Sequence, residues 1–158
     1  MRRYAHHPPL RAAAPGRGGE RGPPGRPRRT GWFDAVGVRY AARVNGLDAL
    51  ALMKLDVLDE RDPILVCTGY RYRGEVLTEF PNETDILAEC QPVYEALPGW
   101  RQSTVGILEE AKLPPACQAY IRRLEALVGV PFTLVSTGPR RDEIIVRPNA
   151  LWQAWGLD

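Results

Sequence analysis

The stretch "LPPACQAYIRRLEALVGVPFTLVSTGP", residues 113–139, decides the fold of this 158-residue chain. Its first half predicts a helix, because two prolines suit a first helical turn, apolar residues recur at helical spacing, and Gly129 can end the helix. Residues 131–136 predict a strand rich in β-branched and aromatic side chains, followed by the loop "STGP". A helix that leads directly into a buried strand is typical of α/β proteins.

The same alternation extends along the chain. Residues 34–46 predict a helix with Asp34 at its N-cap and Gly46 in the left-handed position at its end. Strands are predicted at 49–54, 64–72, 75–80 and 144–146, the second and third joined as a hairpin at Arg73-Gly74. Residues 81–112 are expected to be irregular, and "NALWQAW" to form a short C-terminal helix. The expected fold class is therefore α/β, part of a mixed, mainly parallel sheet with covering helices.

Composition divides the chain into two parts. Residues 1–30 carry eight arginines against one acid, whereas the remainder has more acidic than basic residues, and the total charge is +2. Residues 1–24 are rich in Arg, Pro and Gly and hold few large apolar side chains, so we expect a disordered basic head. Residues 25–158 are expected to form one folded unit with its own core.

Several classes of protein are not expected from this composition. No apolar run approaches the roughly 20 residues that a membrane span needs, and no signal peptide is evident. Three cysteines without CxxC spacing indicate free thiols and a cytoplasmic location. His6 and His7 are the two histidines of the chain and lie among prolines, so a metal site or a histidine base is not expected in the folded part. The basic head allows nucleic-acid binding, but the acidic folded part argues against it.

Three loops could carry chemistry. The first is "GRPRRTGW", residues 25–32, whose arginine guanidinium groups could hold phosphate or carboxylate groups; the alternative is a solvated basic linker. The second is Lys54-Leu55-Asp56 at the end of a predicted strand. If the strand continues through it, Lys54 and Asp56 share a face at the sheet edge where ligands of α/β proteins bind. The alternative is an ion pair at the end of the strand.

An aspartate at such an edge suits guanine. Its carboxylate can accept hydrogen bonds from both N1–H and the exocyclic amine of guanine, and adenine offers no such pair of donors. The third loop, Ser136-Thr137-Gly138, could add backbone N–H groups and hydroxyls that contact a purine. Its alternative is an ordinary turn between a strand and a loop.

In combination, these motifs resemble one family. "GRPRRTGWFDAVGVRYAARVNG", "LALMKLDVLD", "YEALPGW", "LPPACQAYIRRLEALVGVPFTLVSTGP" and "RRDEII" occur in an order and at spacings similar to the C-terminal third of adenylosuccinate synthase. The resemblance covers residues 25–147. It implies a cytoplasmic, homodimeric ligase that joins L-aspartate to IMP with GTP as co-substrate and Mg²⁺ as metal, in AMP biosynthesis.

The resemblance also implies roles for residues of this chain. Lys54, Leu55 and Asp56 match the guanine-recognition motif, and Ser136, Thr137 and Gly138 match a second loop that contacts guanine. Arg26 matches a residue on the IMP side of the site. Arg28 matches one shared by aspartate and GTP, and Gly25, Arg26 and Arg28 together match the aspartate loop.

The chain also departs from the family pattern. The family's loop at this place is one residue longer and contains two threonines, whereas this chain has "GPPGR" at residues 22–26. The hydroxyl donors for the aspartate substrate are therefore missing. The family's phosphate loop, magnesium-binding aspartate and catalytic histidine have no counterpart here. Phosphoryl transfer depends on such a cradle and metal, so we expect the chain alone to be inactive, with no catalytic residue and no metal ligand of its own. A stand-alone, weak guanine-nucleotide-binding module is the alternative, and a basic-tailed nucleic-acid-binding protein a more remote one.

Overall fold

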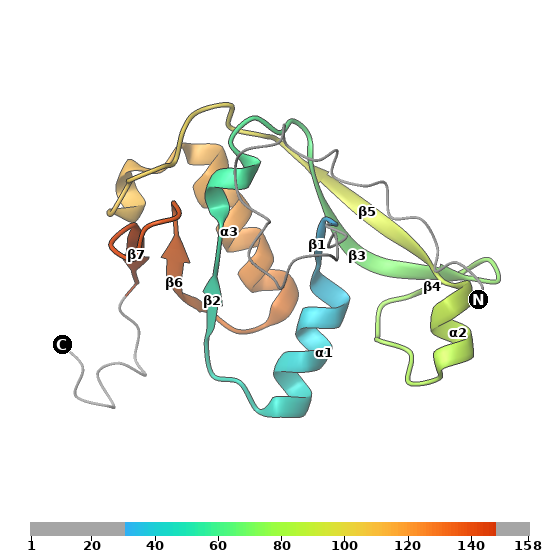
Figure 1. The fold of residues 1–158 in the computed structure, drawn as a ribbon. Helices are drawn as coiled ribbons and strands as arrows, with labels where there is room; N and C mark the ends of the chain where they lie inside the picture. Colours follow the sequence, from blue (N-terminus) through green and yellow to red (C-terminus); the bar gives the residue numbers. More distant parts are fainter. Residues whose placement is uncertain (1–30, 148–158) are drawn as a thin grey trace, which may run out of the picture.

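The computed structural model describes residues 31–147 (Figure 1). The predicted disordered head, the C-terminal helix, and Gly25, Arg26 and Arg28 lie outside these residues. The described part contains two small mixed sheets with α-helices packed against them, which confirms the α/β class.

The first sheet is built on the long strand β3 (Ile64–Tyr72). Strand β5 (Gln91–Leu97) runs antiparallel along one edge of β3. The other edge carries β1 (Phe33–Asp34), which is parallel, and β4 (Glu75–Leu77), which is antiparallel and completes the predicted hairpin. Figure 1 shows the ribbon of β3 and β5 running from the loops beyond β2 towards α2 (Thr84–Glu89).

The second sheet has the order β2-β6-β7. Strand β2 (Leu50–Leu52) lies parallel to β6 (Phe132–Ser136), and β7 (Ile144–Val146) is antiparallel to β6. The described part thus has more antiparallel than parallel pairings, so the prediction of a mainly parallel sheet is corrected to two mixed ones. The reason is that β3–β4 and β6–β7 are joined by short connections, which permit antiparallel pairing without a crossover.

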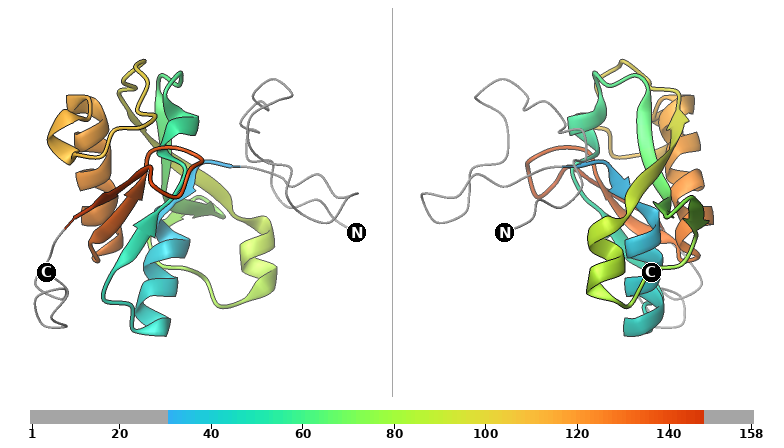
Figure 2. Two further views of the ribbon diagram at one scale, coloured as in Figure 1. Left: turned by 60° about the vertical axis from the view of Figure 1, so that its left-hand side comes forward. Right: turned by 90° about the vertical axis from the view of Figure 1, so that its right-hand side faces the viewer.

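Both helices predicted within residues 31–147 are present, with the predicted ends. Helix α1 (Ala35–Asn45) begins at Asp34, whose carboxylate accepts hydrogen bonds from the N–H groups of Val36 and Gly37. It ends at Gly46 with φ of 59°, in the left-handed region. Helix α3 (Pro115–Val128) ends in the same way at Gly129. The two helices pack against each other, and α1 also contacts β3 (Figure 2).

The core lies between these helices and the two sheets. The face of α3 predicted to be apolar is buried, and Trp100 from the "YEALPGW" segment packs in the same cluster with its ring centroid 5.8 Å from that of Tyr120. Cys67, Cys90 and Cys117 are all buried free thiols. Among residues 31–147, no helix has the length and apolar character to cross a membrane.

The prediction for residues 81–112 was wrong in part. This segment holds α2, β5 and the 3₁₀ turn η2 (Glu110–Lys112). The prolines suggested an irregular segment, but Pro92 lies in β5 opposite Tyr70, on an edge strand where a missing N–H is tolerated. Pairing with β3 thus decides the structure of this segment, and local composition does not reveal it.

Candidate functional site

Two of the three candidate loops leave the same edge of the second sheet. Strands β2 and β6 are parallel, with Leu52 opposite Val135 near their carboxyl ends. The loop after β2 contains Lys54 and Asp56, and the loop after β6 contains Ser136 to Gly138. Contacts between β6 and the 3₁₀ helix η1 (Leu55–Leu58) bring the two loops together (Figure 1). The carboxyl edge of parallel strands is where ligands of α/β proteins bind.

The prediction that Lys54 and Asp56 share one face of a strand was wrong. Strand β2 ends at Leu52, and Lys54 has φ of 63° and ψ of 44°, in the left-handed region. Lys54 is the N-cap residue of η1, and Asp56 lies in the first turn. Positive φ is uncommon for a residue with a side chain and costs free energy, so such residues gather at functional sites.

Asp56 carries the most unusual chemistry of the site. Its Oδ1 atom is buried and has no hydrogen-bond partner in the described structure. Burial raises the pKa of Asp56 above its ordinary value; the positive charge of Lys54 lowers that pKa, and the charges of Asp59 and Glu143 raise it further. A carboxylate can only accept hydrogen bonds, and burying an acceptor without a donor is costly. The site is therefore suited to a ligand that brings N–H donors to Asp56.

The second loop is held by hydrogen bonds within the protein. The Ser136 hydroxyl donates to the carbonyl of Gly138 at 2.9 Å, and the Thr137 hydroxyl donates to the carbonyl of Ile107 at 2.9 Å. Both side chains are buried. These hydroxyls therefore fix the shape of the loop, and so does the Thr137 N–H, which donates to the carbonyl of Glu143 at 2.9 Å. Polar contact with a ligand is left to the rest of the loop backbone.

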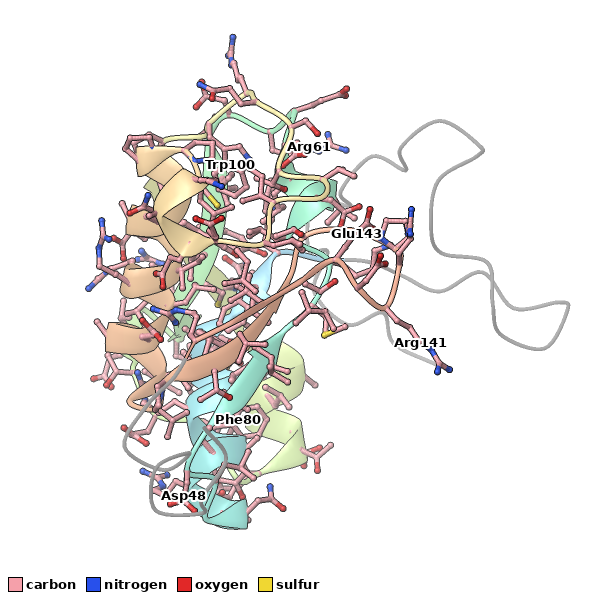
Figure 3. All side chains as sticks on the ribbon, turned by 90° about the vertical axis from the view of Figure 1, so that its left-hand side faces the viewer. Asp48, Arg61, Phe80, Trp100, Arg141 and Glu143 are labelled. Atoms are coloured by element: carbon pink, nitrogen blue, oxygen red, sulfur yellow. The ribbon has the colours of Figure 1, made fainter. Side chains whose placement is uncertain are left out.

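Gly138 lies directly beneath an acidic side chain. A Cβ atom on Gly138 would lie 2.2 Å from Oε2 of Glu143, which accepts a hydrogen bond from the backbone N–H of Arg140. Glu143 stands on the loop between β6 and β7, together with Arg141 (Figure 3). The absence of a side chain at position 138 lets this loop fold closely on itself.

Sequence reasoning missed Glu143 and Asp59 as neighbours of the site. Both influence the pKa of Asp56 through their charge. Asp59 is three residues beyond Asp56 in "KLDVLDE", a spacing that a turn of helix brings back to the same region, and this spacing could have signalled it. Glu143 offered no such signal, because only the fold of the loop between β6 and β7 brings it to Asp56.

Gly25, Arg26 and Arg28 of the first predicted loop lie outside the described residues, so their roles stay predictions. In the described part of the chain, no group of three or more His, Cys, Asp or Glu side chains could hold a metal ion. The described residues thus do not fit a magnesium site, and no reaction step is assigned to a metal on them.

Comparison with known proteins gives one consistent family. A match to the family described as Adenylosuccinate synthetase covers residues 13–145. A protein of that name from Citrifermentans bemidjiense is 53% identical over 125 residues, which are 79% of this chain and 29% of that protein. One from Moorella thermoacetica is 56% identical over 122 residues, 77% of this chain and 29% of that protein. The chain thus spans less than a third of the length of these relatives.

A solved structure agrees with the sequence relatives. Its title describes fully ligated adenylosuccinate synthetase from Plasmodium falciparum. It superposes with a TM-score of 0.73 at 35% identity, over 78% of this chain and 30% of that one. The described fold is therefore similar to about a third of that enzyme.

Proposed function

The chain belongs to the adenylosuccinate synthetase family, and we propose that it supplies the guanine-binding part of a ligase that joins L-aspartate to IMP at the expense of GTP, within AMP biosynthesis. The observation that carries this proposal is the buried Oδ1 of Asp56 without a donor, at an edge where a second, closely folded loop meets it. In a member of this family, a buried acceptor without a donor is explained by a ligand that donates a hydrogen bond to it.

The proposed recognition follows from hydrogen-bonding chemistry. Asp56 accepts from N1–H and the exocyclic amine of guanine, whereas adenine presents a bare ring nitrogen at N1. Lys54 lies along the base with its aliphatic stem, and Leu55 between them is 1% exposed and anchors η1 in the core. The 136–138 loop lies on the O6 side of the base. Ser136 and Thr137 shape this loop, because the Thr137 N–H already donates to the carbonyl of Glu143 at 2.9 Å, and the N–H of Gly138 is the donor assigned to O6.

The remaining roles are carried over from the resemblance. We propose that Arg26 contacts IMP and that Arg28 lies between GTP and aspartate, with Gly25 allowing close approach of the backbone. These three residues belong to a loop whose guanidinium groups can hold carboxylate and phosphate oxygens. A homodimer and a cytoplasmic location are part of the same proposal. A monomer in sedimentation equilibrium of the complete enzyme, meaning a hybrid in which this chain replaces the matching part of a full-length relative, would contradict the former.

Exchanging a single atom tests the guanine assignment. In Asp56→Asn, the amide keeps one acceptor for N1–H and places a donor where the base amine lies, so GTP is disfavoured and XTP, which carries a carbonyl there, is favoured. We expect GTP affinity to fall about 10- to 100-fold, the loss of hydrogen bonds to a charged group, and XTP affinity to rise. Isothermal calorimetry on the chain and on the complete enzyme measures both.

A matched control is Asp48→Asn, which makes the same chemical change at an exposed turn away from both loops. It should leave the GTP-to-XTP preference unchanged. Equal GTP binding by wild type and Asp56→Asn would refute the role of Asp56.

We further propose that this 158-residue chain by itself makes no adenylosuccinate. Transfer of a phosphoryl group needs a preorganised cradle and a metal to stabilise its spreading charge, and the chain corresponds to 29% of its relatives. An assay with IMP, aspartate, GTP and Mg²⁺ should show no turnover above background. Measurable product from the purified chain would contradict this proposal.

A stand-alone guanine-nucleotide-binding module is the second candidate, and the same Asp56 geometry favours it. Without a phosphate cradle the binding would be weak, since only the base is held. Calorimetry separates the two candidates: binding of GTP by the isolated chain supports a module, whereas binding only in the complete enzyme supports the ligase part.

A further inference from the structure

A hydrogen-bonded path connects the two loops of the proposed guanine site. The Asp59 N–H donates to the carbonyl of Asp56, at the end of η1. The carboxylate of Asp59 then accepts from the backbone N–H and the hydroxyl of Thr104, each at 2.8 Å. The N–H of Ile107 donates to the carbonyl of Thr104 at 3.1 Å, and the carbonyl of Ile107 accepts from Thr137. The path thus runs from the loop after β2 to the loop after β6.

The residues in the middle of the path are tightly fixed. Thr104 is fully buried, and Trp100 donates its indole N–H to Asp59 at 2.9 Å. Gly99 lies against the chain just after η1, where a Cβ atom would be 1.9 Å from the carbonyl oxygen of Arg61. The linking segment, residues 99–107, is therefore pressed onto the end of η1 at one side and onto the 136–138 loop at the other.

We propose that the linking segment sets the spacing between the two loops of the guanine site, with Asp59 and Thr104 as positioning residues that determine base specificity without touching the base. This inference rests on the proposed function. The physical reason is that Asp56 accepts hydrogen bonds from two donors on one edge of the base, while the 136–138 loop contacts another edge of the same base. A displacement between the loops weakens the directional hydrogen bonds of Asp56 more than it weakens contact with the base face.

The structure explains why such a link is needed. The Asp56 carboxylate is destabilised by burial, and Lys54 before it holds a left-handed backbone conformation. A turn with a buried carboxylate and a left-handed residue is unfavourable by itself, and it keeps its shape only when neighbouring contacts hold it. Asp59 supplies this support directly, because its backbone binds Asp56 and its side chain binds the linking segment.

The test compares three substitutions in the linking segment. Thr104→Val removes the hydroxyl from the path and keeps the side-chain shape, while Thr104→Ser restores the hydroxyl. Ser103→Ala is the matched control, since the Ser103 oxygen accepts only a local bond from Val105 within the same exposed stretch. GTP and ITP affinities are measured by calorimetry on the complete enzyme, because ITP lacks the exocyclic amine that Asp56 binds.

We expect Thr104→Val to lower the ratio of GTP to ITP affinity about 3- to 10-fold, equivalent to part of one charged hydrogen bond. Thr104→Ser and Ser103→Ala should keep the ratio within about twofold. A well-folded Thr104→Val variant with an unchanged ratio would overturn the inference.

A second measurement needs no ligand and separates this inference from the proposed function. Thr137→Val breaks the other end of the path, and the indole N–H resonance of Trp100 should shift, because the path through Ile107, Thr104 and Asp59 joins the two side chains. An unshifted Trp100 resonance would refute the link. Wild-type enzyme that binds GTP and ITP equally would refute the proposed base recognition, while the Trp100 resonance would still decide whether the loops are coupled.

Discussion

At the scale of single residues, Asp56 combines a binding role with a cost to the fold. Its carboxylate oxygen is buried without a donor, and burial raises its pKa above the ordinary value of 3.8. A raised pKa means that the folded state holds the proton more tightly than the unfolded state does. The unliganded fold therefore loses stability as pH rises through the folded-state pKa of Asp56, and the loss is absent below the unfolded value.

This gives a prediction for Asp56→Asn without ligand. At neutral pH the variant should have a higher free energy of unfolding than wild type, because it no longer buries a charge. The difference should shrink as pH falls through the raised pKa and vanish below about 3.8. Urea denaturation across pH 3 to 8 measures it, and a variant that is less stable at pH 7 would contradict the assignment of burial as the dominant cause.

At the scale of elements, the ends of the helices depend on local chemistry. Asp34 starts α1 by accepting two backbone N–H bonds with one oxygen, and Gly46 and Gly129 end α1 and α3 in the left-handed conformation. These signals are readable in the sequence because each involves residues within a few positions of the helix end. The tertiary contribution is different: the second oxygen of Asp34 accepts a 2.5 Å hydrogen bond from the Tyr70 hydroxyl on β3.

Because Asp34 both caps α1 and binds Tyr70, its removal should lower the stability of the fold strongly. Asp34→Ala loses the cap and leaves a buried tyrosine hydroxyl without its acceptor, so the free energy of unfolding should fall by about 2–4 kcal/mol. The control Asp48→Ala, at an exposed position, should change it by less than about 0.5 kcal/mol. Chemical denaturation of both variants checks this, and equal stabilities would show that the bond to Tyr70 and the cap contribute little.

The strand ends show the limit of local reasoning. The alternation of side chains predicted a shared face for Lys54 and Asp56, but the chain leaves β2 at Leu52 and turns through a left-handed residue into η1. The pairing of β2 with β6 covers three residues and stops at Leu52, which lies opposite Val135. Register with a strand some 80 positions away in the chain is not encoded in the triplet itself.

At the scale of the whole molecule, one arginine joins separate elements. Arg147, just beyond β7, donates to Glu110 at 2.7 Å, to Glu125 of α3 at 2.5 Å and to the carbonyl of Phe132 at 2.7 Å. Its side chain is 18% exposed, whereas the Arg140 side chain, paired with Asp142, is 71% exposed. Charges removed from water depend on their partners far more than exposed ones do.

We therefore expect Arg147→Met to lower the free energy of unfolding by about 2–3 kcal/mol, since it removes the charged donor of Glu110 and of the Phe132 carbonyl and leaves Glu125 with the N–H of Phe132 alone. The matched control Arg140→Met should cost no more than about 1 kcal/mol, because its pair is exposed to water. Thermal denaturation at low and high salt distinguishes them: the Arg147 effect should persist in high salt. Similar losses for both variants would contradict a special role for Arg147.

By itself, the sequence determined the α/β class, the two long helices with their caps, the hairpin at Arg73-Gly74, the buried face of α3 and the family. These features depend on periodicity, capping and turn residues that act over a few positions, and the family depends on several linked motifs. The tertiary structure alone decided that β5 pairs with β3, that Lys54 and Asp56 lie in a turn, and that Thr104 and Glu143 come close to the candidate site. Such features depend on pairing and burial between distant segments, whose free energy no short stretch of sequence contains.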